Sequence, residues 1–319
     1  MTFNDLRFSD LLITPHGYFF RFLEGGEHPV TKIPEDYREE IDEMLCKLKD
    51  CHKLDGGEFF YMHKNKPFRV AVIQTIDGVS FFLRKLQFPI AKLDSLNLCK
   101  GMIANLIRLG RHGQGLIVIS GATGAGKTTT IYSLLLEYAN RYNDIIVSVE
   151  DPPEIPINKL YEDKYSGLWY QIDAKKAGGY DTAMIQAMRY NPRFIFLGEI
   201  RTPVAAREAL RAAINGHLVI TTIHGNSIQG AIMALQQIAG GTHGFTNTIL
   251  ANGLLCVVQQ RLTYTPKKGR KIDADMLLVE NNTSILSKIR EGKLELLNTD
   301  IEMQRMKLSK NICLSEMGG

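Results

Sequence analysis

The sequence predicts an α/β protein with a parallel sheet covered by helices on both faces, preceded by a smaller α+β domain. From about residue 100 onward, short apolar, β-branched or aromatic runs alternate with helical segments, which is the pattern of a parallel sheet. Before that point, one helix is followed by a hairpin. The chain has 319 residues, 45% of them hydrophobic and 23% charged, so it can bury two ordinary cores. We place the domains at residues 1–97 and 98–319.

The N-terminal domain is predicted from a helix and a hairpin. Residues 35–50 carry apolar side chains at a helical period, with acids in the first turn and lysines toward the end. Residues 68–86 contain two β-rich runs around Asp77-Gly78, a strong hairpin signal. A two-residue loop there pairs Arg69 with Leu86 and Ala71 with Arg84. Arg69 and Arg84 are then diagonal neighbours on one face, where they either bind an anion or face water. Residues 88–97 are predicted to be a linker.

The second domain is predicted from its alternating elements. Strands are expected at residues 116–120, 145–149, 194–197 and 218–222, and helices at 128–142, 181–190 and 204–214. Thr202-Pro203 supplies an N-cap and a first-turn proline for the last of these helices. Residues 283–310 are predicted to form one or two amphipathic helices.

Residues 121–128, GATGAGKT, match the phosphate-binding pattern G-x-x-x-x-G-K-[ST] without a mismatch. A predicted strand precedes the motif and a predicted helix follows it, as the motif requires. Glycines let backbone N–H groups turn toward a phosphate, and the helix adds its positive N-terminal end. Lys127 would reach the β- and γ-phosphates, and the Thr128 hydroxyl would bind Mg²⁺. The predicted nucleotide-binding residues are Gly121, Ala122, Thr123, Gly124, Ala125, Gly126, Lys127, Thr128 and Thr129.

Acidic and histidine side chains follow the predicted strands. Glu150 and Glu199 come at two strand ends, so both are expected at the rim that carries the phosphate loop. Either carboxylate could orient water or join Thr128 as a metal ligand. His217 and His224 bracket the strand at 218–222, and both are expected near this rim as phosphate sensors.

Several classes of protein are disfavoured by the sequence. No secretory signal is apparent, and no apolar run approaches the about 20 residues of a membrane span. The five cysteines are scattered without a C-x-x-C pair, so neither a zinc site nor a disulfide framework is expected. This use of cysteine is typical of a cytoplasmic protein. The net charge of +4 is small for a duplex-DNA binder. The basic stretch at 265–271 is interpreted as a solvated turn.

The sequence resembles the secretion-type ATPases of type IV pili and of type II and type IV secretion, most closely their PilT-like branch. GATGAGKTTT is similar to the family's Walker A motif, and SVEDPPE to its acidic box with Glu150 and Asp151. MRYNPRFIFLGEIR resembles its atypical Walker B segment, and AAINGHLVITTIHGNS its histidine box. QRL at 260–262 and SILSKIREGK at 284–293 also match. Two acids of the Walker B segment are missing, Thr202 replaces an Asp, and the tetracysteine zinc element of assembly ATPases is absent.

The resemblance, over residues 68–310, implies a PAS-like N-terminal domain and a RecA-like ATPase domain that work as a homo-hexameric ring. It implies ATP and Mg²⁺ as cofactors, Glu199 as the base and Glu150 as its helper. It also implies that Arg69 and Arg84 reach the nucleotide, and it marks Arg189 and Arg201 as further basic positions. The motor would drive retraction-like pilus dynamics, or a related secretion or conjugation machine, through an inner-membrane platform protein. No direct contact with nucleic acid and no zinc are expected.

Two other functions remain open on the same residues. A nucleic-acid translocase would need a basic pore with stacking aromatics and would hydrolyse ATP faster with DNA. A small-molecule kinase would act as a monomer, would need an acceptor pocket, and would not need Arg69 or Arg84.

Overall fold

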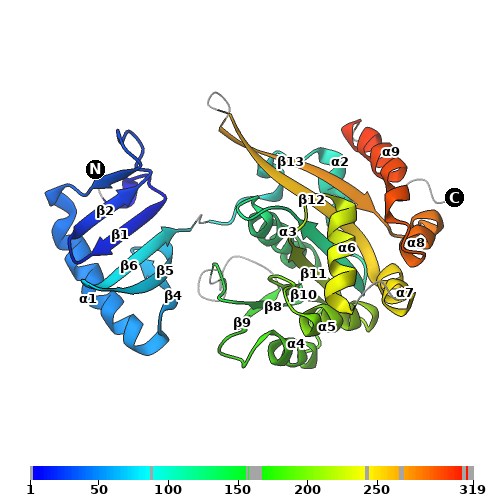
Figure 1. The fold of residues 1–319 in the computed structure, drawn as a ribbon, viewed down its shortest axis with the longest axis horizontal. Coiled ribbons are helices and arrows are strands. Elements are labelled where there is room, and N and C mark those ends of the chain that lie inside the picture. The colour runs from blue at the N-terminus through cyan, green and yellow to red at the C-terminus, as the bar shows by residue number, and fades with distance from the viewer. Residues whose placement is uncertain are drawn as a thin grey trace. The chain divides into compact units, whose positions relative to one another are not determined.

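The computed structural model describes residues 3–86, 89–155, 157, 167–240, 244–265, 269–310 and 314. The chain divides into two compact units, one of Met1–Pro89 with Pro152–Pro156 and one of Ile90–Asp151 with Ile157–Gly319 (Figure 1). Residues 90–97 therefore group with the second unit rather than the first. Leu93 and Leu96 are buried, and the Ser133 hydroxyl donates to the Ala91 carbonyl at 2.7 Å. Part of the predicted linker, residues 87–88, lies outside the described residues, as do 266–268 of the basic stretch.

The first unit is an antiparallel sheet with a helix packed on one face (Figure 1). Its strands are β1 (Asp10–Thr14), β2 (Gly17–Arg21), β3 (Val30–Lys32), β4 (Glu58–His63), β5 (Lys66–Thr75) and β6 (Gly78–Lys85). Their order is β3-β2-β1-β6-β5-β4. The helix α1 (Arg38–Asp55) buries Ile41, Met44 and Leu48. It runs past the predicted end at residue 50 and stops at Gly56, whose φ of 86° favours glycine.

The β5–β6 hairpin is confirmed, but its predicted register is wrong by two residues. Thr75 pairs with Gly78, so Ile76 and Asp77 form the loop, and the Thr75 hydroxyl donates to the Gly78 carbonyl at 2.8 Å. Gly78 has a φ of 127° and takes the position after the two loop residues. Arg69 and Arg84 are therefore directly opposite each other rather than diagonal. A shift of two residues leaves both side chains on the same face.

The second unit is a seven-stranded sheet in the order β13-β12-β7-β11-β10-β8-β9. All neighbouring pairs are parallel except β12 and β13. Its strands are β7 (Gly115–Ser120), β8 (Ile145–Glu150), β9 (Leu168–Asp173), β10 (Phe194–Leu197), β11 (Leu218–Ile223), β12 (Leu254–Thr265) and β13 (Gly269–Leu278). The four predicted strands are confirmed as β7, β8, β10 and β11.

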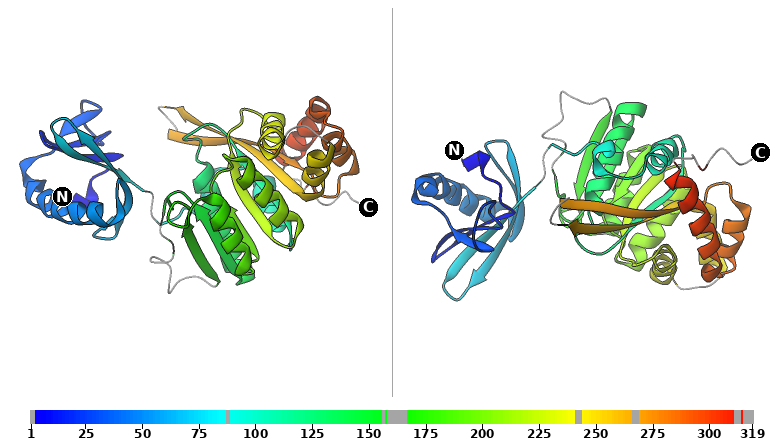
Figure 2. Two further views of the ribbon diagram at one scale, coloured as in Figure 1. Left: turned by 60° about the horizontal axis from the view of Figure 1, so that its bottom comes forward. Right: turned by 90° about the horizontal axis from the view of Figure 1, so that it is seen from above.

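Helices cover both faces of this sheet (Figure 2). On one face, α3 (Lys127–Tyr142) packs Tyr132 and Tyr138 against Phe196 and Phe194, and α2 (Lys100–Leu109) packs against α3. On the other face, α4 (Tyr180–Arg189), α5 (Pro203–Ile214), α6 (Ile228–Ala239) and α7 (Gly244–Gly253) share one apolar core with the sheet. The C-terminal helices α8 (Thr283–Arg290) and α9 (Leu297–Ser309) follow β13. Thr202 caps α5 by accepting from the Ala205 amide, as predicted.

Candidate functional site

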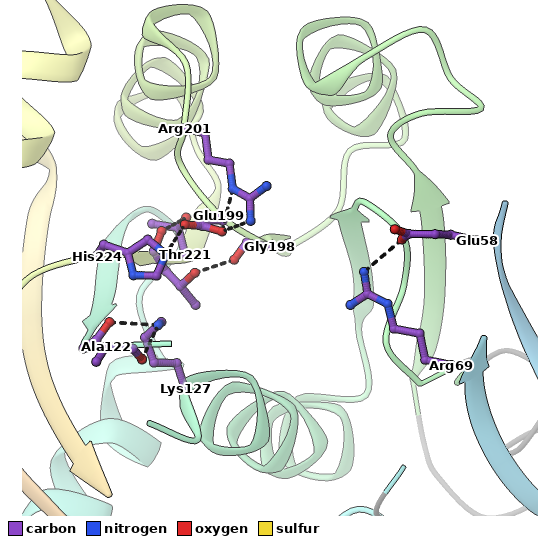
Figure 3. Close-up of polar contacts among 11 residues, drawn as sticks. Glu58, Arg69, Ala122, Lys127, Gly198, Glu199, Arg201, Thr221 and His224 are labelled. Carbon is purple, nitrogen blue, oxygen red and sulfur yellow. Dashed lines mark hydrogen bonds and ion pairs between the residues drawn. The ribbon is translucent and has the colours of Figure 1, made fainter. Parts of the chain in front are cut away.

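The phosphate loop connects β7 to α3, as its motif requires. Gly121, Gly124 and Gly126 all have positive φ, at 153°, 78° and 82°. A side chain at Gly121 is also excluded by space, since a Cβ there would lie 2.3 Å from the Gln260 carbonyl oxygen. Lys127 Nζ donates to the carbonyl oxygens of Gly121 and Ala122, at 2.9 and 3.0 Å (Figure 3). The lysine thus closes the loop on itself at the start of the helix.

Gln260, on β12, holds the loop from inside the domain. Its Nε2 donates to the Ala125 carbonyl at 2.6 Å, and its Oε1 accepts from the Thr130 hydroxyl at 2.9 Å. Gln260 and Thr130 are both fully buried. One side chain therefore links the loop, the first turn of α3 and the strand next to β7. Gln260 belongs to the QRL motif at 260–262, but nothing in that motif predicts this contact.

Glu199 lies two residues after β10, between two basic side chains (Figure 3). Arg201 Nη2 and Nε lie 2.6 and 2.7 Å from Glu199 Oε2, and His224 Nε2 lies 2.8 Å from Oε1. The hydrogen bond and charge of Glu199 raise the pKa of Arg201. The carboxylate is mostly buried, whereas the side chains of Arg201 and His224 are more than half exposed. The side chains of Arg201 and His224 fix the orientation of Glu199, and both remain accessible to a ligand.

Glu150 ends β8 and is 3% exposed. Tyr132 Oη donates to its Oε2 at 2.6 Å, and Gln171 Nε2 donates to its Oε1 at 3.2 Å. The Oε1 of Gln171 accepts from the Ile157 amide at 2.6 Å. Since Tyr132 lies one turn after Thr128 on α3, this network connects Glu150 to the helix that begins at the phosphate loop.

Gly198 takes the place where many phosphate-loop enzymes carry an acid. A Cβ at Gly198 would lie 3.3 Å from the Val149 carbonyl oxygen and 3.5 Å from Glu150 Cγ. The Gly198 amide donates to that Val149 carbonyl at 2.8 Å. The absence of a side chain therefore lets the Glu150 side chain occupy the space between β8 and β10.

The strand order decides how far these groups lie from the phosphate loop. The loop follows β7, His224 follows the adjacent strand β11, and Glu199 follows β10, the next strand along. With strands about 4.8 Å apart, Glu199 lies about 10 Å along the rim from the loop's strand. The parallel strands therefore bring the phosphate loop, His224 and Glu199 to the same rim.

His217 does not lie at this rim, so the prediction that it sits near the phosphate loop is wrong. It precedes β11, and its Nδ1 lies 2.7 Å from the Pro192 carbonyl oxygen. Six strand residues, about 20 Å, separate it from the rim. The histidine is buried and contributes to packing at the amino-terminal ends of the strands. Arg189, which ends α4 shortly before β10 begins, also lies toward these amino-terminal strand ends.

Arg69 and Arg84 belong to the first unit, and each has a carboxylate partner there. Arg69 Nη2 lies 3.3 Å from Glu58 Oε2 (Figure 3). Arg84 Nε lies 3.1 Å from Oδ1 of Asp10, which is itself mostly buried. The Arg84 side chain is 68% exposed. The Asp10 contact thus holds Arg84 at its Nε, while most of the side chain remains accessible.

Three side chains near the rim were not found from the sequence. Gln171 and Tyr132 carry no motif of their own, and only strand pairing could reveal their contact with Glu150. Tyr180, at the start of α4, has Asp151 and the two site glutamates as charged neighbours. Burial, and then the charge of Asp151, raise the pKa of Tyr180 to about 12, so its hydroxyl stays protonated at neutral pH.

The residues present fit a nucleotide phosphate and a magnesium ion. Backbone amides at a helix N-terminus, glycines with positive φ and a lysine suit phosphate oxygens. A threonine hydroxyl with carboxylates nearby is the all-oxygen donor set that Mg²⁺ prefers. No group of three or more His, Cys, Asp or Glu side chains in the described part of the chain gathers as a self-contained metal site. The hydroxyl of Thr128 would therefore need phosphate oxygens or water as further ligands.

The fold and this rim define a phosphate-loop protein with a RecA-like core. The chain belongs to the type II/IV secretion system protein family, whose model matches residues 57–306. It is 30% identical to the competence protein ComGA of Bacillus subtilis over 236 residues, covering 70% of this chain and 64% of that protein. It is 32% identical to the type II secretion system protein E of Xanthomonas campestris over 284 residues, covering 84% of this chain and 46% of that protein.

The solved structures agree with this placement. The pilus retraction motor PilT with bound ADP superposes with a TM-score of 0.77 at 26% identity, covering 98% of this chain and 92% of that one. The DotB ATPase of Legionella pneumophila shares the fold, with a TM-score of 0.71 at 19% identity over 96% and 89%. This chain is thus a secretion-type ATPase family member of the PilT-like branch. It spans about half to two thirds of the length of the curated relatives named above.

Proposed function

We propose that this chain is a Mg²⁺-dependent ATPase whose turnover drives pilus dynamics of the retraction kind, or a related secretion or conjugation machine. The observation that carries the proposal is the rim itself. It sets the phosphate loop with Lys127 against a carboxylate, Glu199, which is held between Arg201 and His224. The match to PilT, whose structure holds ADP, supports the same reading.

Each residue of the rim has a task in this proposal. The loop amides and Lys127 bind the β- and γ-phosphates, and a bound Mg²⁺, held by Thr128, would offset their negative charge. Glu199 orients the attacking water and accepts its proton. To free Glu199 for this step, Arg201 turns from the carboxylate toward the γ-phosphate, and its exposed side chain has the room to do so. His224 keeps its contact with Glu199 and senses whether the γ-phosphate is bound. Glu150, fixed by Tyr132 and Gln171, supplies negative charge toward the Thr128 side.

The two units cooperate in the proposed cycle. The first unit is proposed to be PAS-like and to bring Arg84 and Arg69 to the phosphates, where an arginine contributes 10³–10⁵ in rate in other NTPases. The Asp10 contact pre-orients Arg84 for that approach. A hexameric ring would convert the motion into work on an inner-membrane platform protein from the cytoplasmic side. None of the helices within the described residues combines the length and apolarity that a membrane crossing requires.

The test is the Mg²⁺-ATPase rate per chain over a range of protein concentrations. Glu199→Gln should abolish turnover while leaving nucleotide binding intact. Glu302→Gln, the same change at an exposed carboxylate on α9, should leave turnover unchanged. Lys127→Ala should lose binding.

Arg84→Ala separates a ring motor from a self-sufficient monomer. A rate that rises with concentration and collapses in Arg84→Ala is the expected outcome, because the site is then completed by assembly and domain closure. A rate that is flat with concentration, in chains shown by sedimentation to be monomeric, and indifferent to Arg84 contradicts the motor. Persistent turnover in Glu199→Gln contradicts the assignment of the base.

A further inference from the structure

A second charged feature of the ATPase unit lies outside the nucleotide rim. A cleft of about 610 Å³ runs along α2 and the last turn of α3. Its lining contains one carboxylate, Asp94, and four basic side chains, Lys100, Arg108, Arg111 and Arg141. Arg108, Arg111 and Arg141 lie at or just beyond the C-terminal ends of these helices, whereas the phosphate loop lies at the start of α3. The cleft is therefore remote from the proposed ATPase site.

The cations of the cleft differ in how they are held. Arg108 is fixed by a bidentate pair with Glu280 at 2.6 and 3.1 Å, and Arg141 pairs with Glu137 at 3.2 Å. Lys100 and Arg111 are exposed, and the residues that the structure describes provide neither with an ion-pair partner. Two fixed cations and two unpaired ones around one hollow leave a net positive site for an anionic ligand.

The floor of the cleft is apolar. Ile103, Ala104 and Ile107 lie between the basic residues along α2, with Ile103 and Ile107 one turn apart. A ligand that fills the cleft therefore needs apolar side chains toward the floor and carboxylates toward the rim. That is the chemistry of an amphipathic acidic protein segment.

Two other anionic partners fit the cleft less well. Single-stranded nucleic acid needs an open aromatic face, but the Arg193 guanidinium lies 4.6 Å over the Tyr142 ring, and Tyr138 and Phe194 pack beside it. A lipid bilayer presents a broad, flat surface, which fills a hollow of about 610 Å³ less well than a single chain segment does. A protein segment can enter the cleft and meet both the floor and the rim.

We propose that this cleft is a docking site for an acidic, amphipathic segment of a partner protein. The proposal does not depend on ATP hydrolysis, because none of the residues involved contacts the phosphate loop. It assigns α2 the role of a partner-binding helix on the side of the domain remote from the nucleotide.

The test uses a defined probe, a fluorescein-labelled helical 18-residue peptide with leucines on one face and glutamates on the other. Saturable binding by anisotropy is expected, and it should weaken as salt rises from 0.1 M to 1 M, where the Debye length falls from about 10 Å to about 3 Å. The same peptide with glutamine for glutamate should bind at least about tenfold more weakly, because the carboxylates supply the electrostatic attraction.

Charge reversal locates the site. The double variant Lys100→Glu/Arg111→Glu should weaken peptide binding at least about tenfold, because both side chains are exposed and carry the unpaired charge. The matched control, Arg207→Glu on the exposed face of α5, should not. Unchanged thermal melting and unchanged basal ATPase rate in the double variant exclude a folding defect.

Other outcomes would overturn the proposal. No saturable peptide binding, or binding that the double variant leaves intact, rejects the cleft as the site. Stronger, cleft-dependent binding to anionic phosphatidylglycerol vesicles or to single-stranded DNA assigns it to another class of ligand. Loss of self-association in the double variant, seen by sedimentation, assigns the cleft to a second copy of this chain.

Discussion

Replacing Gln260 by leucine tests whether this buried side chain sets the shape of the phosphate loop. Leucine has a similar volume but neither donates nor accepts a hydrogen bond. The change removes the 2.6 Å bond to the Ala125 carbonyl and the 2.9 Å bond from the Thr130 hydroxyl. Both partners are buried, at 5% and 0% exposure, so neither recovers a water easily.

The magnitude follows from these two contacts. A buried polar group left without a partner costs about 1–3 kcal/mol, so the pair costs about 2–6 kcal/mol if the structure stays rigid. The loop is the softer side of the contact, because it bounds the rim while β12 lies inside the sheet. If about 2–3 kcal/mol of this cost is relieved by a change in loop shape, nucleotide affinity falls roughly 30- to 150-fold, at about 1.4 kcal/mol per factor of ten.

The assay compares ADP binding by calorimetry with thermal melting in the presence and absence of ADP. The matched control is Gln259→Leu, the same substitution at the neighbouring residue, which is also buried and lies on the opposite face of β12. Gln260→Leu should lose most of the ADP-induced rise in melting temperature, whereas Gln259→Leu should keep it. If both variants bind ADP like the original chain, the loop does not depend on Gln260, and the reasoning is refuted.

Three further predictions concern other contacts. Tyr132→Phe removes the 2.6 Å hydrogen bond to Glu150 and should destabilise the protein by about 1–2 kcal/mol, measured by urea unfolding. It should also lower kcat, measured by steady-state kinetics. An unchanged kcat would show that the position of Glu150 does not affect ATP hydrolysis. Gly121→Ala should abolish nucleotide binding, because its Cβ would lie 2.3 Å from a backbone oxygen, and binding near the original affinity would show that the loop relaxes at little cost. Glu280→Gln should cost about 2 kcal/mol at pH 7 by urea unfolding, since it removes the charge partner of the partly buried Arg108. Burial alone would raise the pKa of Glu280, but the hydrogen bond and charge of Arg108, and then His112, lower it below its usual 4.5. The pKa of Glu280 is therefore lower in the folded than in the unfolded state, so its stabilisation of the fold is present above about pH 4.5 and is lost as pH falls through the folded-state pKa. Glu280→Gln should therefore lose less stability on acidification than the original chain does. Identical dependence of the unfolding free energy on pH in the two proteins would contradict the pairing.

The sequence by itself determined the features that depend on short stretches of chain. The phosphate loop is eight consecutive residues, and its glycines have the positive φ that the motif predicts. The β5–β6 hairpin, the strands β7, β8, β10 and β11, and the cap of α5 at Thr202 follow from local periodicity and turn chemistry. Glu199 and His224 were placed at one rim because parallel strands bring their carboxyl ends to the same edge.

Only the tertiary structure decided the contacts between distant residues. Thr130 and Gln260 are separated by 130 positions, and Glu150 and Gln171 by 21 positions on strands whose adjacency no local pattern records. The separation of His217 from His224 needed no tertiary contact, because the six residues of β11 between them span about 20 Å and put them at opposite ends of one strand. The facing of Arg69 and Arg84 depended on which two residues formed the turn. The physical reason is that local patterns report the backbone period, whereas strand order and register are set by packing of the whole core.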